Sequence, residues 1–147
     1  MKTMKKLYIG MGAAVEKDGK FLILKRSDSK DFAPNSWEII TGRIEEEESP
    51  SDGILREISE ETGLNTDIVM PIETGFFYRG GKEFPMVFIS YWCRYLGGDV
   101  KLNWEHSEFK WASIDEILKE TTMNHFHKMF EKIHLLKQYL PEGFTLH

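Results

Sequence analysis

Cysteine is almost absent from this 147-residue chain, in which Cys93 is the only one. An internal disulfide is therefore excluded, and the cytoplasm, a reducing compartment, is the expected location. Long apolar runs are missing too: "MVFISYW" (86–92) is among the longest, well below the roughly 18 residues of a membrane-spanning helix. The first ten residues are basic but lack the apolar stretch of a signal peptide, so none is predicted.

Positive charge is not in excess either. The chain has 19 Lys and Arg against 24 Asp and Glu, for a net charge of −5. Without a basic stripe, no nucleic-acid polymer is expected as a partner. Hydrophobic residues make up 41% of the chain, enough for a buried core, and no linker or repeat divides it. A single domain over residues 1–147 is predicted.

Strand-like and helical patterns follow one another along the chain. The first is a hairpin over 7–26 that turns at Asp18-Gly19, a strong two-residue turn signal. Further strands are expected at 37–40, 67–79, 84–96 and 107–113, and helices at 49–63, 113–120 and 124–140. Strands before and after the first helix, with a helical end to the chain, predict an α+β fold with a mixed sheet covered by helices.

The first helix has clear local boundary signals. Ser49 suits the N-cap, Pro50 the first helical position, Asp52 the capping-box position and Gly63 the C-terminal stop. The helix is therefore expected to begin and end at these residues whatever packs against it.

Negative charge is concentrated around this helix. Between Arg43 and Glu61 eight acids face two bases, so this stretch carries a net charge of −6. Within the helix, Glu57, Glu60 and Glu61 are spaced i, i+3 and i+4 and share a face. Like charges at this spacing repel by about 0.2–0.5 kcal/mol per pair, and the helix dipole disfavours them in the C-terminal half. A solvated acidic face is the ordinary explanation, but a hard divalent cation would turn this repulsion into binding.

The stretch "GRIEEEESPSDGILREISEETGL" (42–64) then shows a recognisable spacing. Gly42, Glu48, Arg56-Glu57-Ile58, Glu60-Glu61 and Gly63-Leu64 are separated by five, seven, one and one residues. This pattern resembles the Nudix box of the Nudix hydrolase family, which has a MutT-like domain, with every defining position filled. "FLILKR" before the box, "WEI" leading into it and "EFKWASIDEI" near the end are also similar to the family.

The resemblance implies the Nudix fold, a mixed β-sheet sandwiched between α-helices, and a Mg²⁺-dependent enzyme for which Mn²⁺ is an alternative. Such an enzyme cleaves a phosphoanhydride in a nucleoside diphosphate linked to another group, by water attack at phosphorus. By position in the box, Glu60 and Glu61 resemble the main metal ligands, and Glu57 a further ligand or the general base. Glu48 would support the metal shell, and Arg56 would hold the glutamates in place.

One position departs from the family pattern. The family usually reads Pro-Gly-Gly before the box, whereas this chain reads Ile40-Thr41-Gly42. The residue at position 41 typically offers its backbone carbonyl to the metal, and Thr41 has that carbonyl too. A β-branched residue would be strained there if φ had to be positive.

Other residues are weaker candidates. The family sometimes takes a further ligand or base from downstream, for which either Glu105 or Glu108 is suitable; the alternative is a solvated strand edge. Lys25 and Arg26 could contact phosphates, although neighbours on a strand face opposite ways.

The remaining candidates lie at the end of the strand expected at 67–79. Phe76, Phe77, Tyr78 and Arg79 could stack on a base or bind the substrate, but strand aromatics are more often core. The histidines, among them His106, show no metal-site spacing and are expected to bind nothing.

Two alternatives to a hydrolase stay open at this point. One is a non-catalytic Nudix-fold nucleotide sensor, and the other is an enzyme like isopentenyl-diphosphate isomerase, for which Cys93 is the only available thiol. The substrate is a small molecule whose identity the sequence leaves open, although compactness favours a nucleoside triphosphate or another small diphosphate. Homodimerisation, common among relatives, also stays open.

Overall fold

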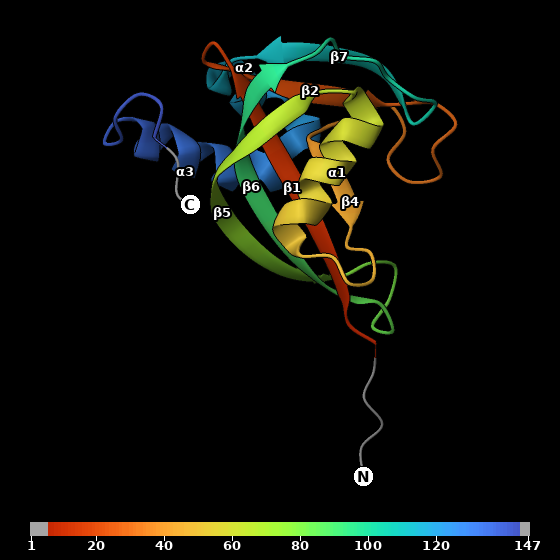
Figure 1. Cartoon of the computed structure of the whole chain (residues 1–147). Coiled ribbons are helices and arrows are strands. Elements are labelled where there is room, and N and C mark those ends of the chain that lie inside the picture. Colours follow the sequence, from red (N-terminus) through yellow and green to blue (C-terminus); the bar gives the residue numbers. More distant parts are fainter. Residues whose placement is uncertain (1–5, 145–147) are drawn as a thin grey trace.

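The computed structural model describes residues 6–144, which form one seven-stranded sheet with helices on both faces (Figure 1). The strands are β1 (Tyr8–Lys17), β2 (Lys20–Arg26), β3 (Trp37–Glu38), β4 (Ile40–Arg43), β5 (Asn65–Tyr78), β6 (Pro85–Gly97) and β7 (His106–Ala112). The helices are α1 (Pro50–Thr62), α2 (Ile114–Lys119), the 3₁₀ helix η1 (Thr121–Phe126) and α3 (His127–Lys137). None of the helices in this range is long and apolar enough to cross a membrane.

The sheet is mixed, as the sequence predicts. Its main path runs β3-β2-β1-β6-β5, while β4 pairs with β1 and β7 with β2. β1 and β6 are parallel, and all the other pairs are antiparallel. The predicted hairpin of β1 and β2 is confirmed, because Asp18 and Gly19 adopt the positive φ values, 51° and 79°, of a tight two-residue turn.

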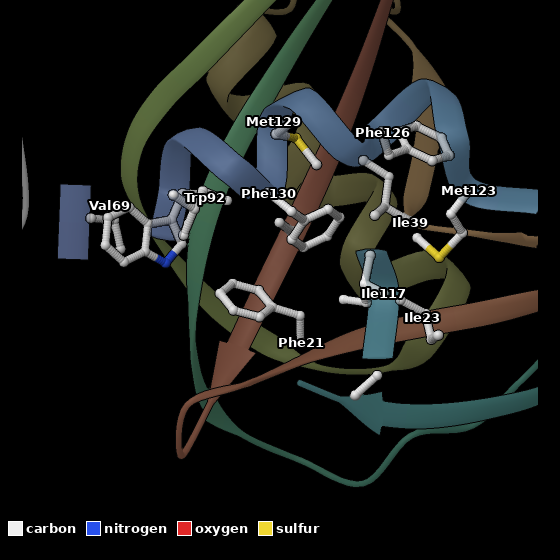
Figure 2. Packing of buried hydrophobic residues seen from close by; sticks show 13 residues of the cluster. Phe21, Ile23, Ile39, Val69, Trp92, Ile117, Met123, Phe126, Met129 and Phe130 are labelled. Carbon is white, nitrogen blue, oxygen red and sulfur yellow. The ribbon is translucent and has the colours of Figure 1, made fainter. Parts of the chain in front are cut away.

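The central strands are buried on both faces, which explains their nearly continuous apolar sequences. Side chains alternate along a strand, so Leu22 and Leu24 pack under α1, while Phe21 and Ile23 pack under α2, η1 and α3. Figure 2 shows the second layer, where Phe21 and Phe130 meet edge to face with their ring centroids 5.3 Å apart. The two layers fix the position of α1 relative to the sheet.

The boundaries of α1 are those that its sequence predicts. The hydroxyl of Ser49 accepts a hydrogen bond from the backbone N–H of Asp52 at 3.1 Å, Pro50 begins the helix, and Gly63 ends it with φ 75°. Glycine is favoured in the left-handed conformation at this position, where its backbone N–H satisfies a carbonyl at the end of the helix. The capping box of α2, between Ser113 and Glu116, is complete.

Two predictions about secondary structure and burial are wrong. The C-terminal helix expected at 124–140 is divided, since the 3₁₀ helix η1 ends at Phe126 and α3 extends only from His127 to Lys137. The aromatic residues Phe76, Phe77 and Tyr78 are exposed rather than core. β5 is an edge strand, and the buried clusters among the described residues extend along it only as far as Ile72. The C-terminal end of β5 therefore lies outside these clusters.

Candidate active site

The three box glutamates of α1 have different environments. Glu57 and Glu61, one helical turn apart, point into the protein: the side chain of Glu57 is 15% exposed and Glu61 is 8% exposed. Glu60 is 59% exposed and reaches only Arg56, whose Nη1 donates to it at 3.1 Å. The shared acidic face predicted from the spacing is therefore split into a buried pair and an exposed third member.

Gly42 lets the side chain of Glu57 lie against the backbone of β4. A Cβ atom added at Gly42 would lie 2.2 Å from Cδ of Glu57, which no real structure tolerates. The reason for glycine here is close approach, because Gly42 has no positive φ. Thr41 does not have a positive φ either, so the strain considered for a β-branched residue does not arise.

Gly42→Ala is expected to lower kcat about 10²-fold, because the methyl group displaces the Glu57 carboxylate, and an error of about 1 Å at such a group has an effect of this size. Steady-state kinetics with circular dichroism measures the effect and checks the fold. Gly75→Ala is the matched control, since a Cβ there meets no atom within 4 Å. Equal kinetics in the two variants would contradict this role of Gly42.

Arg56 holds several carboxylates together. Its Nε and Nη2 donate to the two oxygens of Glu48 at 2.7 and 3.0 Å, and its Nη1 donates to Glu57 at 3.0 Å. Hydrogen bonds from Arg56 and from the backbone N–H of Glu45 lower the pKa of Glu48 to about 2. The fork fixes Glu48 as an anion and restricts Glu57 to one orientation.

Glu61 is surrounded by other carboxylates. Burial raises its pKa to about 9, and the charges of Glu105 and Glu57 add to this. Burial also raises the pKa of Glu57. One oxygen of Glu61, Oε2, is buried and has no hydrogen-bond partner among residues 6–144.

Two residues from outside the box complete this region. Ligand atoms of Glu61, Glu105 and His106 all lie within 4.8 Å of one another. Glu105 also forms an ion pair with Lys30 at 3.5 Å. The structure thus separates the two downstream glutamates, because Glu108 is not in this group and forms an ion pair with Lys25 at 3.2 Å on the β2–β7 ladder.

His106, which the sequence predicts to bind nothing, contacts a carboxylate within the protein. His106 is 6% exposed, and its Nε2 lies 2.7 Å from Oε2 of Glu38. Arg26 donates from Nη1 to both oxygens of Glu38, at 3.1 and 3.0 Å. Arg26 is therefore engaged with a buried carboxylate.

Sequence reasoning missed Glu38, His106 and Lys30 as members of this region. The only signals available were Glu38 within "WEI" and His106 beside Glu105 in "NWEHSEF". At the other end of the sheet, Phe77 and Arg79 lie exposed on and after β5.

The donor set fits a divalent cation. Carboxylate oxygens are the ligands that Mg²⁺ and Mn²⁺ prefer. Burial raises the pKa values of Glu57 and Glu61, and the negative charge of Glu105 adds to both shifts. A buried oxygen of Glu61 without a partner is the atom that a cation would satisfy. These residues are where the structure can hold a metal.

A mixed sheet between helical layers, with a candidate cation site beside one helix, defines an α+β protein that can hold a metal. Comparison with known proteins gives the family: the model of the NUDIX domain matches residues 7–132. The chain belongs to the NUDIX family and is a Nudix pyrophosphohydrolase. Metal dependence is typical of this family.

Three relatives illustrate the similarity. The MutT-like protein of Streptomyces ambofaciens is 28% identical over 106 residues, which are 72% of this chain and 63% of that protein. The nucleoside triphosphatase NudI of Escherichia coli O81 (strain ED1a) is 28% identical over 113 residues, 71% of this chain and 80% of that protein. A MutT protein from Methanosarcina mazei Go1 has a crystal structure with a TM-score of 0.78 and 28% identity, covering 93% of this chain and 99% of that one.

Cys93 argues against the isomerase-like alternative. It is fully buried in the α1 layer of the core, and burial raises the pKa of its thiol to about 12. A reactive cysteine needs an exposed thiol with a lowered pKa. Cys93 is therefore a packing residue.

Proposed function

We propose that this enzyme hydrolyses a phosphoanhydride bond in a nucleoside triphosphate or a related nucleoside diphosphate derivative, with Mg²⁺ or Mn²⁺. The observation that carries the proposal is the group of Glu61, Glu105 and His106, whose ligand atoms lie within 4.8 Å of one another and which includes a buried oxygen of Glu61 that has no partner among residues 6–144. A polyanionic substrate can approach such a site only when cations neutralise the negative charge of the carboxylates.

In this proposal Glu60, Glu61 and Glu105 are the residues that hold the cations, with the backbone carbonyl of Thr41 as a further donor, while Glu57 serves as the base. When bound, a divalent cation neutralises phosphate oxygens and lowers the pKa of water. The exposure of Glu60 is consistent with a place at the outer side of the site, where the substrate arrives.

The protein's own groups supply orientation and a base. Arg56 holds Oε1 of Glu57, leaving its other oxygen free to accept the proton of the attacking water. The water oxygen forms a bond to phosphorus, and the bond from that phosphorus to the bridging oxygen breaks. The leaving phosphate or pyrophosphate departs with the bridging oxygen and its electron pair. Glu48 keeps Arg56 in place throughout.

The relatives favour nucleoside triphosphates as the substrate class. NudI is described as a nucleoside triphosphatase, and the chain covers most of that protein. Lys25 and Arg26 are predicted phosphate contacts, but both are paired with carboxylates here. Lys25 is the better candidate, because its side chain is 31% exposed while that of Arg26 is 14% exposed. Phe77 and Arg79 are retained as candidate contacts to the distal part of a substrate.

A substrate panel with Mg²⁺ or Mn²⁺ tests the proposal. It contains nucleoside triphosphates, dinucleoside polyphosphates and nucleoside diphosphate sugars. Orthophosphate is measured directly, after inorganic pyrophosphatase and after alkaline phosphatase, which separates release of phosphate, pyrophosphate and phosphomonoester. Hydrolysis of a triphosphate is expected to depend on the cation and on Glu61. Binding without turnover across the panel would instead favour a nucleotide sensor.

A further inference from the structure

His106 occupies an unusual position for a residue that only packs. It begins β7, is 6% exposed, contacts Glu38 through Nε2, and offers a ligand atom within 4.8 Å of those of Glu61 and Glu105. Its Nδ1 is buried and has no hydrogen-bond partner in the described part of the chain. A buried polar nitrogen without a partner is rare in folded proteins and destabilises the fold.

The second such atom lies in the same group. Oε2 of Glu61 is the only other buried side-chain N or O atom without a partner among residues 6–144. The two residues offer ligand atoms within 4.8 Å of each other and of a carboxylate oxygen of Glu105. Both unpartnered atoms therefore belong to residues of this one group.

The partners of the imidazole select the tautomer that a metal needs. In the neutral imidazole whose Nε2–H donates to Glu38, with Nε2 and Oε2 2.7 Å apart, Nδ1 is the nitrogen that carries the lone pair. Glu38 is itself held by the guanidinium of Arg26 through both oxygens. A carboxylate that orients a histidine in this way is the usual support of a histidine ligand in metal sites.

We propose that Nδ1 of His106 is a metal ligand, together with Glu61 and Glu105, in a site with a preference for first-row transition cations over Mg²⁺. Glu38 and Arg26 are the positioning residues of this ligand. Mg²⁺ favours oxygen ligands alone, whereas an imidazole nitrogen added to carboxylates favours ions such as Mn²⁺ and Co²⁺. The inference rests on the proposed function for the role of Glu61 and Glu105, and it adds a nitrogen ligand and a metal preference.

Pulsed electron paramagnetic resonance of Mn²⁺ bound to the full chain, without substrate, tests this assignment. Wild-type protein is expected to show a ¹⁴N coupling that changes to the ¹⁵N pattern when histidine is ¹⁵N-labelled, a test that needs no substitution. His106→Gln is expected to remove the coupling and to raise the Kd for Mn²⁺ about 10- to 100-fold. The Kd for Mg²⁺ is expected to change less than about threefold, because Mg²⁺ gains little from a nitrogen ligand.

Two further variants make the test specific. His134→Gln is the matched control: His134 is exposed on α3, and the coupling is expected to persist. Glu105→Gln, which alters a half-buried side chain near the surface, is expected to weaken Mn²⁺ binding even if His106→Gln fails to fold.

The possible failures are distinguishable. Bound Mn²⁺ without a histidine coupling, or a coupling that survives in folded His106→Gln, would overturn the role of His106 while Mg²⁺-dependent hydrolysis upholds the proposed function. A histidine coupling in a protein that hydrolyses nothing in the panel would support the metal site and refute the hydrolase proposal. Failure of Mn²⁺ to bind at all would overturn the inference.

Discussion

Replacing Glu61 by Gln is expected to lower kcat about 10³-fold under saturating Mg²⁺ while the protein stays folded. The substitution keeps the shape of the side chain and removes the negative charge from the centre of the cluster formed with Glu57 and Glu105. A glutamine offers one neutral oxygen where a carboxylate offers two charged ones, so a divalent cation is held weakly and in a poorer position. Losses of about 10²–10³-fold follow the removal of a single preorganised charge-stabilising group in other enzymes.

Steady-state kinetics on the best substrate of the panel measures this effect. The matched control is Glu46→Gln, which makes the same chemical change at an exposed residue of the loop before α1. Its kcat is expected to stay within about twofold of wild type. If Glu61→Gln turned over at the wild-type rate, Glu61 would not be part of the catalytic site.

The same substitution is expected to stabilise the metal-free protein. In the folded state burial raises the pKa of Glu61 to about 9, whereas its ordinary value is 4.5. Between these values the folded chain retains a proton that the unfolded chain has released, so the free energy of unfolding decreases as pH rises. The contribution of Glu61 to the free energy of unfolding is fully present below about pH 4.5 and is lost progressively as pH rises towards 9. At pH 7 this loss is about 3 kcal/mol.

Glu48 responds in the opposite direction at lower pH. Its hydrogen bonds from Arg56 lower its pKa to about 2, so its contribution is present above about pH 4.5 and is lost as pH falls towards 2. The metal-free wild type is therefore expected to be most stable near pH 4.5–5, with Glu61 responsible for most of the decrease above it.

Urea unfolding in EDTA at pH 5, 7 and 8.5 tests this pH dependence. Glu61→Gln is expected to be more stable than wild type at pH 8.5 and about equal at pH 5, while Glu46→Gln follows the wild-type curve. Mg²⁺ should reverse the order, because it binds the ionised folded state of wild type only. If Glu61→Gln were less stable than wild type at pH 8.5 in EDTA, burial of the Glu61 carboxyl group would not be destabilising and the expected pH dependence would be wrong. Gain of stability with loss of turnover is the usual sign of a site under strain.

Local features of the chain predict much of the secondary structure of this protein and the positions of the glutamates on α1. The start and end of α1 follow from Ser49, Pro50 and Gly63, because caps act over one turn. The hairpin follows from Asp18-Gly19 for the same reason. The spacing of Glu57, Glu60 and Glu61 places them on neighbouring positions of one helix, whatever the rest of the chain does.

Local sequence patterns do not predict contacts between residues that are far apart in the chain. His106 and Glu38 are 68 residues apart in sequence and meet only because β3 and β7 both pair with β2. Local pattern alone also left open the choice between Glu105 and Glu108. The exposure of Phe77 depends on β5 being an edge strand, which is a property of the whole sheet.

By itself the sequence determined the strands and the capped helix, the density of acids in the box and the family to which they belong. Only the tertiary structure decided that Glu61 is buried while Glu60 is exposed, and that Glu105 and His106 join Glu61 in one group. It also left Nδ1 of His106 without a hydrogen-bond partner among residues 6–144. The physical reason is that spacing along one helix sets which side chains are neighbours, whereas desolvation and mutual charge depend on what the sheet and its loops place against that helix.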